Sequence, residues 1–408
     1  MYELEKSKNN DYTIKVNGKY IHSRYNPQKE AEQFIKSNVD LFKKDKVLIY
    51  GIGLGYHIVE ALRKDNIKIY IFEWDERIIE CCKKVNREIF EDNRVTVISK
   101  NNKNFYKLLG QLLDETKDIL IHKPSLDIIK GENEELYNLL NDFSIRKQLK
   151  SINKKTLYKY DENFRKNKRI IYAPLNEFIQ NMKNRCKTII ITAAGPSLDS
   201  KLKYLKKNRQ EVIIFTVGSA LRTVIENDIY PDAIFVIDGS SQIKNQFVGF
   251  ENLNIPLCFS AYASSEALEI YSGPKYIFND NDEDNSFQIT TGGSVAIAAL
   301  DIATKCNPER IVFLGQDLAL LEGKNHVESY EKMHKDRQQQ EYKLIEAPGV
   351  SGNTVKTIQS YILFRNSIER IIKLNQNIKF INCSDGILIR GTVNMDLESF
   401  LDKEINEG

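Results

Sequence analysis

The sequence predicts an α/β protein with two domains, each built on a mostly parallel sheet, together with a small N-terminal β-element and a helical connector. Three observations lead to this prediction. Short apolar runs alternate with helical segments in two separate series, which is typical of βαβ units. A strand-free stretch rich in lysine and asparagine separates the two series. The length of 408 residues also corresponds to two or three domains of about 150 residues each.

The N-terminal β-element is predicted at residues 12–22, where apolar and polar residues alternate around Asn17 and Gly18. An Asn-Gly pair in this position is typical of a hairpin with a two-residue turn. Pro27 then opens a helical stretch. Strands are predicted at 47–50, 67–72 and 95–98, with helical segments between them. We therefore expect a Rossmann-like domain that, together with the β-element, spans residues 1–130.

Residues 131–169 form the predicted helical connector. The second series fills residues 170–408, which we expect to form a second Rossmann-like domain with a C-terminal helical part. Its strands are predicted at 188–192, 212–217, 233–238, 256–260, 276–279, 310–314 and 379–383, and its last long helix at 357–374. No repeat of fixed period is present.

The composition excludes several classes of protein. Hydrophobic residues make up 41% of the chain and charged residues 28%, which argues against a disordered protein or a membrane bundle. The net charge of only +3 does not indicate nucleic acid as a partner. No apolar run approaches the roughly 18 residues of a membrane span, and the first residues lack the apolar core of a signal peptide. We therefore expect a cytoplasmic protein without a membrane span.

The six cysteines include no C-x-x-C pair, and no histidine lies at metal-ligand spacing from them. We interpret them as scattered thiols rather than as disulfides or a zinc site. The sequence thus predicts no metal site.

A glycine-rich loop in the N-terminal domain is a candidate cofactor site. Gly51, Gly53 and Gly55 follow the first predicted strand and precede a helix, and Glu73 ends the next strand. In nucleotide-binding folds such glycines let backbone N–H groups approach a ligand, and such an acid binds a ribose. The spacing G-x-G-x-G is closer to an S-adenosylmethionine-binding loop than to a dinucleotide-binding one. Because no methyl-acceptor site is recognisable, a structural turn without a ligand stays open as the alternative.

The second domain contains two candidate anion sites. Residues 195–197 follow a buried strand and open a helix, and residues 291–293 precede another helix. Backbone N–H groups at a helix N-terminus and small polar residues favour the binding of an anion. Each loop taken singly could also be ordinary turn chemistry.

Two acids and a histidine complete the candidate site. Asp238 and Asp317 each follow a predicted strand, and His326 lies in a polar loop after Asp317. Open α/β sheets bind ligands at the carboxyl ends of their strands, so a carboxylate there can accept hydrogen bonds from a sugar, and His326 can act as a general base. A helix cap is the alternative for either acid, and a surface histidine without a role is the alternative for His326 or for His334.

These motifs resemble, in order and spacing, the motility-associated factor family of flagellin glycosyltransferases. The stretch from His22 to Glu32 is similar to the N-terminal region of the same family, so the resemblance covers all but the tail. The matching segments of the second domain are Ala194-Gly195-Pro196-Ser197-Leu198, Tyr230-Pro231-Asp232 leading into Asp238, Thr291-Gly292-Gly293-Ser294-Val295-Ala296 and Phe313-Leu314-Gly315-Gln316-Asp317-Leu318-Ala319.

The resemblance implies transfer of a nonulosonic acid, of pseudaminic or legionaminic type, from its CMP-activated form to Ser or Thr of flagellin in the cytoplasm before export. The family's central domain is similar to bacterial CMP-sialic-acid transferases, and we expect an inverting mechanism. A CMP-sugar has one phosphate, so a divalent metal is not required, and the acidic residues 280–284 are interpreted as solvated surface. The donor-binding residues implied are Gly195, Pro196, Ser197, Ser219, Asp238, Thr291, Gly292 and Gly293.

The sequence departs from the sialyltransferase pattern at the general base. In those enzymes a histidine of a later loop takes the proton of the acceptor, but the corresponding residues 349–354 contain no histidine. That leaves His326 as the candidate base, with Asp317 as the rival candidate, and our hypothesis is that His326 aids removal of the proton while Asp317 positions the donor or the base. Two alternatives stay open: a pterin diphosphokinase-like enzyme that uses ATP, and a non-catalytic flagellin-binding protein. Self-association into a homo-oligomer is also left open.

Overall fold

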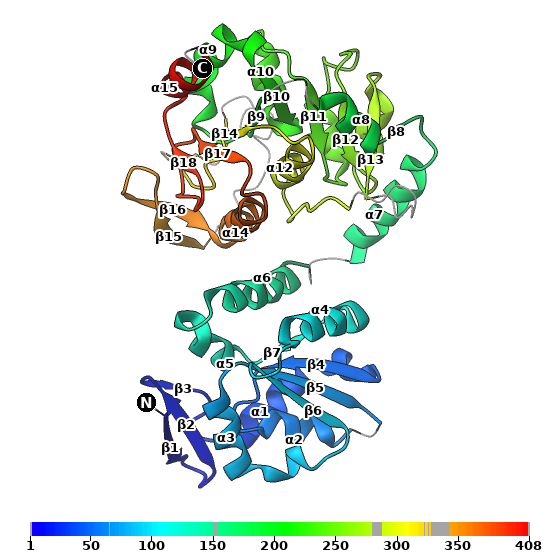
Figure 1. Ribbon diagram of the computed structural model, residues 1–408. Coiled ribbons are helices and arrows are strands. Elements are labelled where there is room, and N and C mark those ends of the chain that lie inside the picture. The colour runs from blue at the N-terminus through cyan, green and yellow to red at the C-terminus, as the bar shows by residue number, and fades with distance from the viewer. Residues whose placement is uncertain are drawn as a thin grey trace. The chain divides into compact units, whose positions relative to one another are not determined.

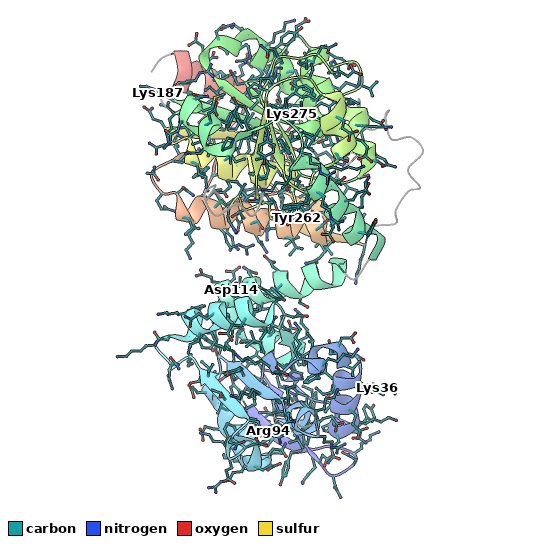
Figure 2. The ribbon with its side chains drawn as sticks, turned by 90° about the vertical axis from the view of Figure 1, so that its right-hand side faces the viewer. Lys36, Arg94, Asp114, Lys187, Tyr262 and Lys275 are labelled. Carbon is teal, nitrogen blue, oxygen red and sulfur yellow. The ribbon has the colours of Figure 1, made fainter. Side chains whose placement is uncertain are left out.

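The computed structural model describes residues 2–64, 66–150, 154–183, 185, 187–279, 288–321, 323–324, 326–327 and 343–406. The chain divides into two compact units, residues 1–152 and residues 153–408. Each unit has a parallel sheet covered by helices (Figure 1), which confirms the predicted fold class. Within each unit, buried apolar side chains fill the space between the sheet and its helices (Figure 2).

The first unit begins with a small antiparallel sheet. Its strands are β1 (Tyr2–Lys6), β2 (Tyr12–Val16) and β3 (Lys19–Tyr20). The predicted hairpin is confirmed, because Asn17 and Gly18 connect β2 to β3 with φ of 47° and 82°, as a two-residue turn of this kind requires. Helix α1 (Pro27–Lys36) follows, and the Asn26 side chain caps it by accepting a hydrogen bond from the Lys29 N–H at 2.9 Å.

A parallel four-stranded sheet forms the centre of the first unit, with strand order β6-β5-β4-β7. Its strands are β4 (Lys46–Tyr50), β5 (Lys68–Glu73), β6 (Val95–Ser99) and β7 (Leu120–Ile121), and its helices are α2 (Tyr56–Leu62), α3 (Glu76–Val85), α4 (Phe105–Thr116) and α5 (Lys123–Ile128). The three predicted strands are confirmed; β7 was not predicted, because two residues are too few to show a period. Since β5 and β7 lie on opposite sides of β4, the strand order reverses between β4 and β7.

The stretch predicted as a connector, residues 131–169, is helical and is divided between the units. Helix α6 (Glu134–Lys150) packs Leu136 and Leu140 into the core of the first unit. Helix α7 (Lys154–Asn167) lies in the second unit, where Asn163 and Asn167 are fully buried. The boundary at residue 152 therefore falls inside this stretch, and each helix is part of a unit's own core.

The second unit is built on a nine-stranded sheet with the order β18-β17-β14-β9-β10-β11-β12-β13-β8, in which every pairing is parallel. The predicted strands all appear, with ends that shift by a residue or two. The strands are β8 (Ala173–Pro174), β9 (Thr188–Thr192), β10 (Ile213–Val217), β11 (Ala233–Val236), β12 (Leu257–Ser260), β13 (Lys275–Phe278), β14 (Arg310–Leu314), β17 (Lys379–Asn382) and β18 (Val393–Asn394).

Helices cover both faces of this sheet, which explains why its strands are continuously apolar. On β9, Ile189 and Ile191 pack with α8, α12 and α14, whereas Ile190 packs with α9, α10 and α15. The helices are α8 (Leu175–Met182), α9 (Leu198–Lys207), α10 (Gly218–Glu226), α11 (Ser265–Ile270), α12 (Val295–Lys305), α14 (Gln359–Leu374) and α15 (Leu397–Phe400). A hairpin of β15 (Leu344–Pro348) and β16 (Thr354–Ile358) precedes α14. The sequence analysis did not predict this hairpin.

Candidate active site

The carboxyl ends of β9 and β14 meet near the centre of the large sheet. The chain continues from β9 to β10 on one side and from β14 to β17 on the other, so the strand order reverses between these two neighbours. Open α/β sheets bind their ligands at such a point. The two following loops touch, since the Gly195 N–H donates a hydrogen bond to the Gly315 carbonyl oxygen at 2.8 Å. A Cβ on Gly195 would overlap this oxygen and the Asp317 carboxylate, so only glycine fits there.

Asp317 holds the two loops together. Its carboxylate accepts hydrogen bonds from the Ser197 N–H at 2.8 Å, from the Ser197 hydroxyl at 2.6 Å and from the Asp385 N–H at 3.0 Å. Burial raises the pKa of Asp317, and the hydrogen bonds from Ser197 oppose this shift. Because Asp317 is 1% exposed and these three bonds stay within the chain, it is placed to position residues 195–197.

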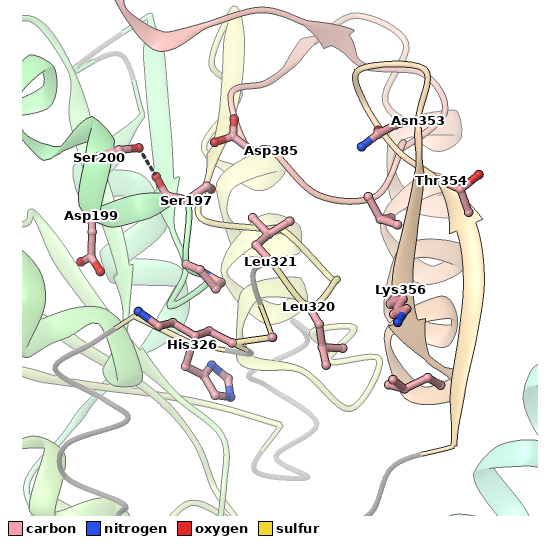
Figure 3. Close-up of a pocket in the computed structure, with 15 residues that line it drawn as sticks. Ser197, Asp199, Ser200, Leu320, Leu321, His326, Asn353, Thr354, Lys356 and Asp385 are labelled. Carbon is pink, nitrogen blue, oxygen red and sulfur yellow. Dashed lines mark hydrogen bonds between the residues drawn. The ribbon is translucent and has the colours of Figure 1, made fainter.

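A pocket of about 830 Å³ opens beside residues 195–197 (Figure 3). Small-molecule sites have volumes of about 300–1,000 Å³. Figure 3 shows Ser197, Asp199 and Ser200 on one side of the pocket and Thr354 and Lys356 of β16 on the other. The first side is the N-terminus of helix α9, whose partial positive charge favours an anionic group. The pocket thus lies between the N-terminus of α9 and a polar hairpin.

His326 lines the same pocket, on the side of Ser197 and Asp199 in Figure 3. The next residue, Val327, is 1% exposed and donates its N–H to the Ala194 carbonyl oxygen at 2.9 Å. This bond holds His326 beside the loop of residues 195–197. A histidine in that place can accept a proton from a hydroxyl group bound in the pocket. His334 and the acidic residues 280–284 lie outside the described residues.

The other predicted donor-binding residues lie along the same edge of the sheet. Ser219 is in the first turn of α10, directly after β10, and residues 291–293 directly precede α12. Asp238 is exposed after β11, and its carboxylate accepts the Ser240 N–H at 2.8 Å. Among the described residues, Pro196 and Ser197 line the pocket, whereas Ser219, Asp238 and residues 291–293 do not.

Two buried asparagines of α7 hold loops at this edge and were missed by the sequence analysis. Asn163 Nδ2 donates to the Gly239 carbonyl oxygen at 2.9 Å, next to Asp238. Asn167 Nδ2 donates to the carbonyl oxygens of Ala261 and Ala263, at 3.0 and 2.8 Å. Tyr262, labelled in Figure 2, also packs on Phe164 of α7. The sequence feature that could have identified them is their spacing: two asparagines four residues apart lie on one face of a lysine-rich helix.

The hairpin wall of the pocket was missed as well. Thr354 and Lys356 are exposed, whereas Val355 and Thr357 between and after them are buried. This alternation is the pattern of a strand with one face toward the core. It was available in the sequence, but the sequence analysis considered residues 349–354 only as the counterpart of a loop.

The glycine-rich loop of the first unit is filled by the chain's own side chains. The Ile52 N–H donates to the Glu73 carboxylate at 3.0 Å, and the Leu54 N–H donates to His22 Nε2 at 2.8 Å. A Cβ on Gly53 would overlap the His22 ring. Burial raises the pKa of Glu73 to about 7. These side chains use the N–H groups that a cofactor would need, which favours the interpretation of this loop as a structural turn.

The cysteines at positions 81, 82, 258, 306 and 383 are free thiols, and Cys186 lies outside the described residues. Over the described ranges, no three His, Cys, Asp or Glu side chains are grouped so that they could hold a metal ion. In the same part of the chain, no helix combines the length and the apolar character needed to cross a membrane.

The fold and the pocket define an α/β protein with a candidate ligand pocket at the switch point of an open parallel sheet. A protein-family model described as 6-hydroxymethylpterin diphosphokinase MptE-like matches residues 158–323. This region includes residues 195–197, Asp238 and residues 291–293. No curated protein matches the sequence.

Among solved structures, the MAf glycosyltransferase from Magnetospirillum magneticum AMB-1 is similar over 98% of this chain and 71% of that chain, with a TM-score of 0.56 and 14% identity. This match confirms, at the level of the fold, the resemblance to the motility-associated factor family. A hydrogen sulfide-producing enzyme from Fusobacterium nucleatum aligns with 74% of this chain and 84% of that chain, at 14% identity and with a TM-score of only 0.16.

Proposed function

We propose that this protein is an inverting glycosyltransferase that moves a nonulosonic acid from its CMP-activated donor to Ser or Thr of flagellin, in the cytoplasm before export. The pocket at the switch point carries this proposal, because it joins the N-terminus of α9 to His326. Support comes from the fold shared with a solved MAf glycosyltransferase and from the motif set of the second domain. The type of nonulosonic acid, pseudaminic or legionaminic, is left to experiment.

The proposed donor site follows from the charge of a CMP-sugar. A single phosphate can be held by N–H groups of the first turn of α9, at Asp199 and Ser200, where Pro196 and Ser197 line the pocket, without a metal ion. Asp317 keeps this loop in place through its bonds to Ser197. We assign Ser219, Asp238 and residues 291–293 to further donor contacts along the same edge, outside the pocket itself.

The proposed chemistry needs one base. The acceptor hydroxyl oxygen forms a bond to the anomeric carbon of the sugar, the bond from that carbon to the phosphate oxygen breaks, and CMP leaves with the electron pair. His326 takes the hydroxyl proton as the new bond forms. Asp317 acts as a positioning residue, since its carboxylate already accepts hydrogen bonds from Ser197 and from the Asp385 N–H.

The test of this assignment is His326→Ala, assayed by mass spectrometry of flagellin after incubation with a CMP-nonulosonic acid. Removal of a general base typically lowers a rate by about 10²–10⁴-fold, and we expect a loss of that size in kcat with little change in donor binding. Glu309→Ala is the control, because Glu309 directly precedes β14 and so lies at the opposite edge of the sheet. Wild-type turnover by His326→Ala would remove His326 from this role.

The family-model match over residues 158–323 favours one further candidate, a pterin diphosphokinase-like enzyme that uses ATP. Release of AMP from ATP in the presence of a hydroxymethylpterin, without CMP binding, would support this candidate. Flagellin binding without sugar transfer would instead point to a non-catalytic flagellin-binding protein. Both outcomes differ from the CMP release that the proposed transferase predicts.

A further inference from the structure

Lys356, on the hairpin wall of the pocket, is not paired with its neighbour on the opposite strand. Its side chain is exposed and lines the pocket, and Figure 3 shows it across from Ser197 and Asp199. Glu346 of β15 lies directly opposite Lys356 in the hairpin register, and residues paired in this way place their side chains on the same face. Even so, Lys356 forms no ion pair with Glu346 or with any other carboxylate of the described residues.

Backbone contacts fix the strand that carries Lys356 relative to the loop of Asp317. The Leu320 N–H donates to the Lys356 carbonyl oxygen at 2.8 Å. The hydroxyl of the next residue, Thr357, is buried and donates to the Leu318 carbonyl oxygen at 2.7 Å. The backbone of Lys356 is therefore held in the pocket wall, and its long side chain can adjust to a ligand.

The other charged groups of the pocket do not neutralise Lys356. The Asp385 carboxylate pairs with Lys201 of α9 at 2.7 Å, and Asp199 lies on the α9 side of the pocket in Figure 3. Lys324, in the turn after β14, adds a second positive charge and likewise forms no ion pair within the described part of the chain. The pocket thus presents positive charge on both walls, at the N-terminus of α9 and at the hairpin.

The donor of the proposed function has two negative groups that lie next to each other. A nonulosonic acid carries a carboxylate on its anomeric carbon, and in the CMP-activated form the same carbon is bonded to the phosphate oxygen. A phosphate at α9 therefore brings the carboxylate into the same pocket, where an unpaired charge would be unfavourable. A lysine ammonium is a compact charge with three N–H donors, which suits a carboxylate.

We propose that Lys356 binds the carboxylate of the donor sugar and so makes the pocket specific for sugars that carry a carboxylate on the anomeric carbon. This inference rests on the proposed function and assigns a specificity-determining residue to the hairpin. Lys356 exchanges no proton in this role, because its charge and hydrogen bonds only orient the sugar.

A matched pair of donor analogues tests the proposal by isothermal titration calorimetry on the full chain. Both are CMP-nonulosonic acids, of pseudaminic and of legionaminic type, in which a fluorine beside the anomeric carbon slows hydrolysis. One analogue has the free carboxylate and the other has its methyl ester. We expect the wild type to bind the acid about tenfold or more tightly than the ester, because the ester lacks the charge that Lys356 binds.

The variant Lys356→Met should bind the acid and the ester equally. It should bind CMP, which has no sugar, as the wild type does, and this binding also shows that the variant is folded. Lys356→Arg keeps the positive charge and should retain a preference for the acid. Lys324→Met is the matched control, since it removes the same charge from the same pocket but not from the hairpin, and it should keep the wild-type preference.

The outcomes separate this inference from the proposed function. Equal affinity of the wild type for acid and ester, or an equal loss of preference in Lys324→Met and Lys356→Met, would overturn the role of Lys356. If the wild type binds CMP in the same experiment, the proposed function still stands. Absence of CMP binding to the wild type would instead refute the proposed function, and this inference with it.

Discussion

Asp317 and His326 lie close together in the sequence, but their surroundings give them different tasks. The Asp317 carboxylate is buried and bonded to Ser197 and Asp385, whereas the His326 ring lines the pocket. The sequence predicted both as catalytic candidates, because both follow the same strand. It could not separate them, since Asp317 is buried by contacts with the loops of Ser197 and Asp385, which lie 120 and 68 residues away along the chain.

At the same scale, the buried histidines should make the stability of the first unit depend on pH. Burial lowers the pKa of His57 to about 3, and an unfolded histidine has a pKa of about 6.5. The unfolded chain therefore binds a proton that the folded unit excludes. This contribution to stability is present above about pH 6.5 and is lost as the pH falls toward the folded value, by about 1.4 kcal/mol per pH unit. His122 acts in the same direction.

Urea unfolding followed by the fluorescence of Trp74 measures this dependence. Trp74 is the single tryptophan of the chain and packs edge-on to Phe105 in the first unit. His57→Phe lacks this histidine. Between about pH 6.5 and 5, its free energy of unfolding should therefore fall less steeply than that of the wild type, by about 1.4 kcal/mol per pH unit. His326→Ala removes a histidine from the second unit and should keep the wild-type slope. Equal slopes for His57→Phe and the wild type would contradict the account.

At the scale of elements, α7 shows how a segment that resembles a connector can shape a site. Its exposed face carries Lys166, but Asn163 and Asn167 are fully buried and donate hydrogen bonds to the loops after β11 and β12. The lysine-rich and asparagine-rich sequence predicted a helical connector, and the segment is helical. The binding partners of the other face are backbone carbonyls, which no sequence pattern identifies.

Asn167→Ala tests the role of α7. The substitution leaves the carbonyl oxygens of Ala261 and Ala263 buried without their donor, which should lower the free energy of unfolding by about 1–3 kcal/mol. Calorimetric melting of the full chain measures the effect on the second unit. Lys166→Ala is the control on the same helix, because its ion pair with Glu162 is partly exposed and should contribute less than about 1 kcal/mol. Equal stability of the two variants would show that Asn167 does not hold the loops.

At the scale of the whole molecule, periodicity predicted the architecture well. Fully apolar runs such as residues 189–191 indicated strands that are covered on both faces, and the alternation with helices indicated parallel sheets. The division of the helical stretch at residue 152 was not predictable, because α6 and α7 join different cores through a few side chains. The pairing of β9 with β14, which creates the site, is a long-range contact that spacing alone does not specify.

The central claim is that the pocket at this switch point transfers a sugar from a CMP donor. Intact-mass spectrometry of flagellin, incubated with the purified protein and a CMP-nonulosonic acid, tests it most directly. The account predicts that flagellin gains the mass of whole nonulosonic acid residues and that one CMP is released for each residue added. Flagellin of unchanged mass with both nonulosonic acid types, in the presence of folded protein, would contradict the claim.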